Sequence, residues 1–342
     1  MKNIINGLCS KARMDSIHNR AINFMESLPD GKKLIEPYLE LRSNRKVLFG
    51  LFYPLILEDW FVSGWEKSFL DEIYARITCM YALIIDLDNR QDKQNKKEIV
   101  FDSKNFDGVS IRYLQKAING QLPEERHVNL WQDQVIAKMY EVFNLVANDK
   151  NCRSLEKDQI SFFKKRFAGH LINAVLNFVQ ETKEVKQFGR RAEKLKISAG
   201  KNELVLGFAS LLGLLMTKEN AEIVHTVSYR LLLPFQIVDD LNDWWEDYEL
   251  NQRTPLLSGV EYGLSHDELY GKLVMNGDFE TMMDIVSKEL AEAEGLLLSK
   301  GKKHKKLFEV VKDLQKQNNE QRESILRFKN FVNTKMKGGG KK

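Results

Sequence analysis

Two clusters of aspartates at the ends of apolar segments carry the clearest chemistry in this sequence. The run "RLLLPFQIVDDLNDWWED" (residues 230–247) places Asp239, Asp240 and Asp243 directly after a hydrophobic stretch. Residues four apart share one face of a helix, so Asp239 and Asp243 would stack there, with Asp240 beside Asp243. Like charges at ~4 Å repel by roughly 1 kcal/mol in bulk water and by about 4 kcal/mol near a protein surface. A divalent cation would offset that cost.

The other cluster lies earlier and is the first in chain order. "ALIIDLDNRQD" ends in Asp88 and Asp92, which are again four residues apart. A separation of about 150 residues allows two helices to face each other across a helical bundle. Mg²⁺ takes oxygen ligands and combines one or two carboxylates with substrate phosphates. The alternative for each cluster is an ordinary solvated acidic face, but the apolar run before Asp239 implies burial, and buried carboxylates need partners.

A phosphate ligand would also need basic side chains. Lys201 and Arg230 precede the second cluster, and Arg253 follows it. Arginine suits bidentate phosphate contacts, whereas lysine acts as a point charge. Further options are Arg190, Arg191 and Lys194. For each of these residues, the alternative is a plain surface position.

Helices are the elements that must position these groups. Apolar residues recur at spacings of three and four, and alternating strand patterns are nearly absent, which predicts an all-α protein. We expect breaks near Pro29-Asp30-Gly31 and Pro54, a loop over 93–108 and a turn-rich break over 251–259. Two or three helices should finish the chain. The other expected helices cover residues 69–92, 128–150, 155–190, 198–216 and 220–249.

Composition bounds the remaining possibilities. The 342 residues include 52 basic and 48 acidic side chains, a balance that does not favour nucleic acid as a partner. No linker separates two halves, so we expect one helical domain over residues 1–333 and a disordered basic tail over 334–342. Three cysteines without a CxxC pair, and no apolar N-terminal run of signal length, indicate a reduced cytoplasmic protein. The longest apolar stretch, 204–216, falls short of the ~20 residues of a membrane span, so we expect no stable membrane insertion.

The motifs resemble those of the trans-type isoprenoid synthases of the all-α class I fold, which include trans-prenyltransferases and class I terpene cyclases. "FQIVDDLND" resembles their second aspartate-rich motif, and "DNRQD" resembles the first, with Asn89 in place of an aspartate. "GKNELVLGFASLLG" is similar to the helix with the family's diphosphate-binding lysine, onto which Lys201 falls, although Asn202 replaces the usual threonine. "RTPLLSGVEYG" resembles a later segment in which Arg253 is the nearest match to a second basic residue.

This resemblance implies a single-domain helical bundle of the isoprenoid synthase type around a central apolar cavity. Several Mg²⁺ ions would bridge the diphosphate of an allylic prenyl diphosphate substrate, and Lys201, Arg230 and Arg253 would bind its oxygens. Aromatic faces stabilise a carbocation by ~0.5–2 kcal/mol each, and Phe235 and Tyr81 are candidates, with plain core packing as the alternative. The metal ligands and catalytic residues would be Asp88, Asp92, Asp239, Asp240 and Asp243.

Departures from the family pattern bear on the reaction. "DGKKLIEP" only partly matches the segment that binds a second diphosphate, and no Arg-Arg-Gly follows Asp92. The resemblance therefore favours a terpene synthase (cyclase) that acts on one prenyl diphosphate and releases diphosphate. The alternative is a chain-elongating trans-prenyltransferase that uses isopentenyl diphosphate, and a non-catalytic partner subunit of the same fold is a third reading. Similar proteins are commonly homodimers, and no motif here decides that.

Overall fold

The structure is a computed structural model, and most of its described residues are helical. It describes residues 10–27, 32–41, 45–93, 143–144, 146–148, 157–184, 191–250, 252, 254–299 and 305–338. Within these ranges there is no β-strand, and β-type pairing is limited to an isolated bridge between Phe61 and Met216. The predicted all-α class is therefore confirmed. No helix among these residues combines the length and the hydrophobicity that crossing a membrane would take.

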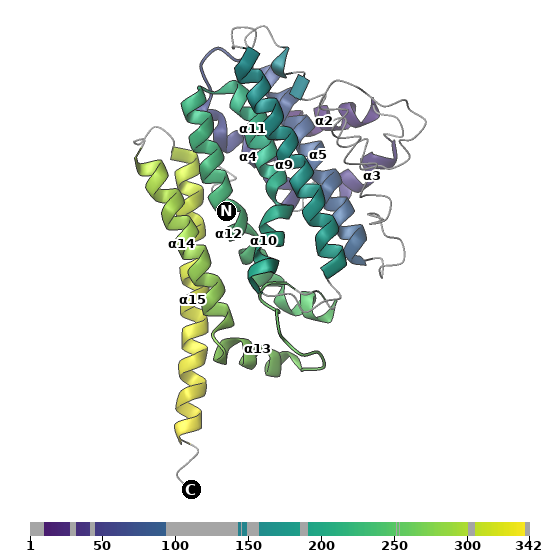
Figure 1. The fold of residues 1–342 in the computed structure, drawn as a ribbon. Helices are drawn as coiled ribbons and strands as arrows, with labels where there is room; N and C mark the ends of the chain where they lie inside the picture. The colour runs from purple at the N-terminus through teal and green to yellow at the C-terminus, as the bar shows by residue number, and fades with distance from the viewer. Residues whose placement is uncertain are drawn as a thin grey trace. The chain divides into compact units, whose positions relative to one another are not determined.

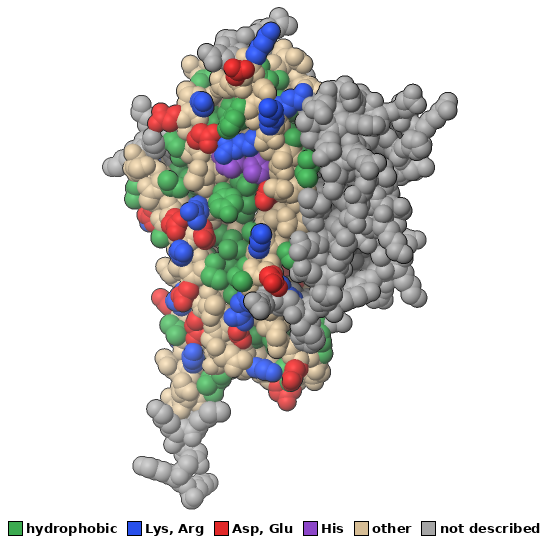
Figure 2. All heavy atoms as spheres, viewed as in Figure 1, with side chains coloured by type: hydrophobic (Ala, Val, Ile, Leu, Met, Phe, Trp, Pro, Cys, Tyr) green, Lys and Arg blue, Asp and Glu red, His purple; other side chains and the backbone are tan. Residues whose placement is uncertain are grey.

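The chain groups into two compact units, each described here by itself. Unit 1 comprises residues 1–175, 204–225 and 304–307, and unit 2 comprises residues 176–203, 226–303 and 308–342. The expected single domain stays a prediction. The acidic and basic side chains are interspersed on the face drawn in Figure 2, in keeping with the near balance of charge.

Unit 1 is organised around a long helix, α5 (Lys67–Lys93), which packs on three shorter helices (Figure 1). Ser10 caps the first of them by accepting a hydrogen bond from the backbone of Arg13. The three helices are α2 (Lys11–Glu26), α3 (Lys32–Leu41) and α4 (Arg45–Leu57), and the short turn η1 (Glu58–Trp60) follows α4.

Helix α11 (Glu203–Leu212) supplies the most hydrophobic part of unit 1, together with the turn η4 (Gly213–Leu215). Every residue of α11 from Leu204 to Leu212 is buried, as expected of a helix that is apolar on all sides. The first part of α9 (Lys157–Glu184) lies against it, since Phe167 and Leu171 of α9 approach Gly207 of α11.

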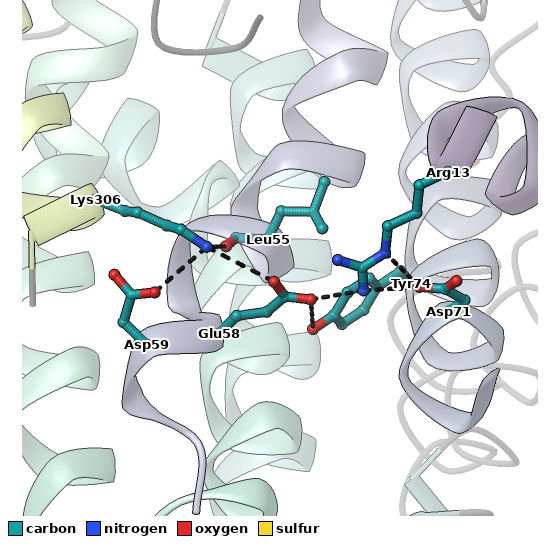
Figure 3. A network of polar contacts seen from close by, with 7 residues as sticks. All are labelled: Arg13, Leu55, Glu58, Asp59, Asp71, Tyr74 and Lys306. Carbon is teal, nitrogen blue, oxygen red and sulfur yellow. Dashed lines mark hydrogen bonds and ion pairs between the residues drawn. The ribbon is translucent and has the colours of Figure 1, made fainter. Parts of the chain in front are cut away.

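A polar network crosses the interior of unit 1 at Arg13 of α2 (Figure 3). Arg13 donates to Glu58 Oε1 at 2.6 Å and to Asp71 Oδ1 of α5 at 2.8 Å, and Tyr74 donates to the same Glu58 oxygen at 3.1 Å. Burial alone would lower the pKa of Arg13, but the hydrogen bonds to the two carboxylates raise it. Burial, followed by the charge of Glu58, raises the pKa of Tyr74. The network therefore ties α2, η1 and α5 together.

The same network holds the beginning of the last helix. Lys306 lies 3.3 Å from Asp59 Oδ1 and 3.6 Å from Glu58 Oε2, and it donates to the Leu55 carbonyl at 3.2 Å (Figure 3). One ammonium group thus bridges two adjacent carboxylates of η1 and the end of α4.

Unit 2 contains α10 (Arg191–Lys201), most of α12 (Lys218–Glu249), α13 (His266–Met275), α14 (Asp278–Leu298) and most of α15 (Lys305–Gly338). Buried residues recur along α14 at helical spacing, from Phe279 to Leu297. Asn318 of α15 is itself buried and donates to the Met283 carbonyl of α14 at 3.0 Å, which fixes how these two helices pair. A capping box of Ser265 and Glu268 begins α13.

The helix boundaries differ from the sequence prediction in two places. The expected break at Pro54 is wrong, because Pro54 lies inside α4, where Leu51 and Leu55 are fully buried. The tertiary packing there outweighs the hydrogen bond that a proline removes. The expected helix over 198–216 instead divides at Asn202, between α10 and α11.

Apart from the C-terminal tail, the other boundaries agree or cannot be compared. Helix α12 continues through Pro234 to Glu249, and α13, α14 and α15 are the finishing helices. Helix α15 runs to Gly338, so residues 334–338 of the expected tail are helical, while 339–342 lie outside the described residues. The breaks at 29–31, the loop over 94–108 and most of the expected helix over 128–150 also lie outside them.

Gly50 is a position where α4 and α5 leave no room for a side chain. A Cβ at Gly50 would lie 2.6 Å from Tyr81 Cβ, whereas a Cβ at Gly169 in α9 would meet nothing within 4 Å. We expect Gly50→Ala to lower the free energy of unfolding by ~1–3 kcal/mol through overpacking. The matched change Gly169→Ala should raise it by ~0.5–1 kcal/mol, because alanine is the better helix former. Urea titration followed by circular dichroism measures both, and equal effects of the two changes would contradict the close contact.

Candidate functional site

The aspartates of α12 point to different sides of the helix. Asp240 is only 4% exposed, Asp239 and Asp247 are half-buried, and Asp243 is exposed. The sequence prediction of a continuous helix through this cluster is confirmed. The helix therefore turns one carboxylate of the "DD" pair into the interior of unit 2.

A chain of hydrogen bonds connects the buried carboxylate to α10. Gln236 Nε2 donates to Asp240 Oδ1 at 2.8 Å, and Gln236 Oε1 accepts from Asn202 Nδ2 at 3.0 Å. Asn202 Nδ2 also donates to the Ser198 carbonyl at 3.1 Å. We call Asn202, Gln236 and Asp240 the amide relay.

The direction of the amide relay follows from its one backbone member. A carbonyl can only accept, so the Asn202 NH₂ group must face the Ser198 oxygen, and its second hydrogen points to Gln236. Gln236 must then present its oxygen to Asn202 and its NH₂ group to Asp240. The relay therefore delivers a donor to Asp240 Oδ1, which suits an ionised carboxylate.

Helix α10 also lies close to the later part of α9. A Cβ at Gly200 would lie only 2.2 Å from the side chain of Asn177, so a larger residue there would require the Asn177 side chain to move. Lys194 and Ser198 are buried, at spacings of eight and four residues before Asn202, and so lie on the same face of α10. This face carries a buried basic residue in line with the relay.

The predicted phosphate ligands have different surroundings. Arg230 donates to Glu289 at 3.0 Å and lies 2.8 Å from Glu292, both on α14, and the hydrogen bond to Glu289 raises its pKa. Arg230 is also about 80° around the helix from Asp240, by helix geometry. Lys201 ends α10, and its side chain lies outside the described residues, as does Arg253. Their roles stay predictions.

Arg191 was a further option for a phosphate contact. It forms an ion pair with Asp278, and its Nε donates to the Pro255 carbonyl at 3.2 Å. These contacts secure the first turn of α10 to the segment after α12 and to the start of α14.

The first aspartate cluster lies in unit 1. Asp88 and Asp92 fall in α5, which extends to Lys93, one residue beyond the expected helix and into the expected loop, and their side chains lie outside the described residues. Tyr81 is half-buried on the same helix, with its ring centroid 6.4 Å from that of Phe208. Phe235 is half-buried on α12 in unit 2. Among the side chains that are described, no three carboxylates, imidazoles or thiols lie together as ligands of a metal.

Aromatic rings secure the segment that follows the α12 aspartates. Tyr248 is buried, accepts from the Leu264 amide at 2.8 Å and donates to the Glu261 carbonyl at 3.0 Å. Trp244 stacks on Tyr270 of α13, with ring centroids 5.7 Å apart, and also contacts His266. Tyr248 therefore holds the acidic end of α12 to the segment that follows it, and Trp244 holds it to α13.

Gln236 lies within the second aspartate-rich motif, but no role in the site was assigned to it from the sequence. Its position four residues before Asp240 places the two side chains on one helix face, so the spacing alone could have indicated their hydrogen bond. The contact with Asn202 could not be read in the same way, because 34 residues separate the two amides.

The amide relay predicts a measurable contribution to stability. Gln236→Leu removes the donor to Asp240 and the acceptor of Asn202, so we expect the free energy of unfolding to fall by ~1–3 kcal/mol. Gln317→Leu is the matched control, since Gln317 donates to Asp313 across one turn of α15 at 2.6 Å. Because that pair joins neighbours on one helix only, its loss should cost less than ~0.5 kcal/mol. Urea titration measures the difference, and equal losses would contradict a special role for the relay.

Comparisons of the chain with protein-family models, curated proteins and solved structures found no match.

Proposed function

We propose that this protein is a Mg²⁺-dependent isoprenoid synthase that ionises an allylic prenyl diphosphate, acting as a terpene synthase that releases diphosphate. The amide relay is the observation that carries the proposal. It joins Asn202 of the "GKN" segment to Gln236 and Asp240 of "FQIVDDLND", the two best-matched motifs of the resemblance. Two segments that were singled out separately in the sequence thus make direct contact within unit 2.

The carboxylates of α12 are the ligand type that the ion in the proposal takes, with Asp240 turned to the interior and Asp243 to the surface. Carboxylate oxygens are the hard ligands that Mg²⁺ takes, and Asp239, Asp240 and Asp243 offer three within five residues. In the proposal Asp88 and Asp92 of α5 supply the other carboxylates. Mg²⁺, when bound, supplies positive charge that stabilises a leaving diphosphate.

The remaining roles in the proposal belong to the chain itself. The relay keeps Asp240 oriented through Gln236, as groups behind a metal ligand commonly do. Lys201, which directly precedes Asn202, provides a point charge for a diphosphate oxygen. Apolar and aromatic side chains such as Phe235 and Tyr81 exclude water from the allylic cation and stabilise it.

Product analysis tests the proposal and its alternatives. We expect the purified protein, given Mg²⁺ and farnesyl or geranylgeranyl diphosphate, to form a hydrocarbon or an alcohol without isopentenyl diphosphate. A longer diphosphate that forms only with isopentenyl diphosphate would instead establish a prenyltransferase. A protein that is silent alone and active only with a second synthase chain would establish a partner subunit. If the protein turns over none of these substrates under any of these conditions, its assignment as an isoprenoid synthase or as a partner subunit of one is refuted.

Single aspartate changes test the assignment of the ligands. We expect Asp239→Ala and Asp88→Ala each to lower turnover by about 10²-fold or more, because each removes charge stabilisation of the leaving group. The helical circular dichroism spectrum should persist in both. Asp267→Ala, at a fully exposed carboxylate of α13, is the control and should keep full activity. A variant at position 88 or 239 with full turnover would remove that residue from the site.

A further inference from the structure

A second polar cluster lies in unit 1 and plays no part in the proposed function. His170 of α9 and His225 of α12 bring their Nε2 atoms to 2.8 Å. Arg166 lies 2.7 Å from His225 Nδ1 and donates to Glu222 Oε1 at 2.6 Å. Histidine side chains reach the surface beside basic groups on the face drawn in Figure 2. Two helices thus meet here through polar groups.

The arginine determines where the protons of both imidazoles lie. A guanidinium only donates, so His225 Nδ1 must accept, and the proton of a neutral His225 must be on Nε2. That proton is donated to His170 Nε2, and the proton of His170 must then be on Nδ1. With both rings neutral, one arrangement of protons therefore satisfies the hydrogen bonds from Arg166 to His225 and from His225 to His170.

The geometry indicates a shared proton rather than a bound metal. The ring centroids are 5.0 Å apart, which exceeds the nitrogen separation by 5.0 − 2.8 = 2.2 Å. This difference is close to twice the distance from an imidazole centre to its nitrogen, so the two nitrogens face one another along the line between the rings. The Arg166 guanidinium occupies the space between Glu222 and His225.

Adding a proton disrupts this arrangement at either ring. Protonation of His225 Nδ1 would oppose the Arg166 donor, and protonation of His170 Nε2 would oppose the His225 N–H. Among the described side chains, the charged groups in this cluster are Arg166 from α9 and Glu222 from α12, while α11 approaches His170 with Gly207. Burial, followed by the charges of Arg166 and His170, lowers the pKa of His225 to about 3.

We propose that the chain of contacts from Arg166 through His225 to His170 is a pH-sensitive latch between α9 and α12 in unit 1. The latch is closed when both imidazoles are neutral, and it opens at the Arg166–His225 contact when His225 takes up a proton on Nδ1. It stands on contacts within unit 1, so it is independent of the isoprenoid synthase proposal.

The sign of the pH dependence follows from linkage. An unfolded histidine takes up a proton near pH 6.5, whereas folded His225 resists protonation down to about pH 3. The contribution of the latch to stability is therefore complete above about pH 6.5 and declines as the pH falls towards 3. Over that interval the unfolding equilibrium constant rises by up to about tenfold per pH unit from this group.

Nuclear magnetic resonance of the full chain, labelled with ¹⁵N-histidine, tests the latch directly. We expect His225 as the Nε2–H tautomer and His170 as the Nδ1–H tautomer at pH 7.5, assigned with His225→Gln and His170→Gln variants. His225 should stay neutral at pH 5. The opposite tautomers, or protonation of His225 near pH 6.5, would overturn the proposal.

A variant that keeps both rings separates the latch from ordinary packing. Arg166→Met removes the donor to Nδ1 and the nearby positive charge, so the pKa of His225 should rise and the latch should open at a higher pH than in the wild type, while burial still holds this pKa below its ordinary value. Hydrogen exchange of the peptides around residues 163–172 and 221–228, corrected for the intrinsic pH effect, should then begin to increase at a higher pH in the variant than in the wild type. His266→Asn in unit 2 is the control and should leave this exchange unchanged. Identical exchange in Arg166→Met and wild type would refute the latch.

Discussion

The two hydrogen bonds of the Asn202 amide are the constraint on which the candidate site depends. One bond satisfies the carbonyl of Ser198 in the last turn of α10, where helical carbonyls lack partners within the helix. The other reaches Gln236 on α12. Asn202 therefore ends one helix and fixes the donor direction towards Asp240 with a single side chain. A threonine, which the resemblance leads one to expect at this position, has only one hydroxyl hydrogen to donate and could not make both bonds.

In each unit an arginine is held by two carboxylates. Arg13 in unit 1 is enclosed by two carboxylates and a tyrosine, and Arg230 in unit 2 is held by two glutamates of α14. Arg230, a basic residue upstream of the acidic motif, thus forms ion pairs between two helices. Lys194 is buried on the same face of α10 as Ser198, whereas Arg230 pairs with α14.

The regular part of the fold could be predicted from the sequence, and the close contacts could not. Helical spacing and the absence of alternating patterns were sufficient for the all-α class and for the extent of α12. Proline was a poor guide at Pro54, because buried neighbours maintain α4 across it. The division at Asn202 was missed because the Asn202 side chain donates both to the Ser198 carbonyl of α10 and to Gln236 on another helix, and no local pattern reveals the second contact. In the same way, the aspartate spacing indicated one acidic face, whereas packing turns Asp240 inward and leaves Asp243 outside. His170 and His225 are 55 residues apart, and their contact depends on the register of two packed helices.

The anchoring of Lys306 has a consequence for dissecting the chain. The ammonium group that neutralises Glu58 and Asp59 comes from a residue 251 positions after Leu55, at the very start of α15. A fragment truncated before α15 would retain α2, α3, α4 and α5 but leave two adjacent carboxylates of η1 without that counter-ion. Such a fragment would carry an electrostatic defect at the centre of its own N-terminal helices. The first turn of the last helix therefore belongs to the polar network of unit 1, and useful boundaries for expression have to respect this long-range ion pair rather than the order of the elements.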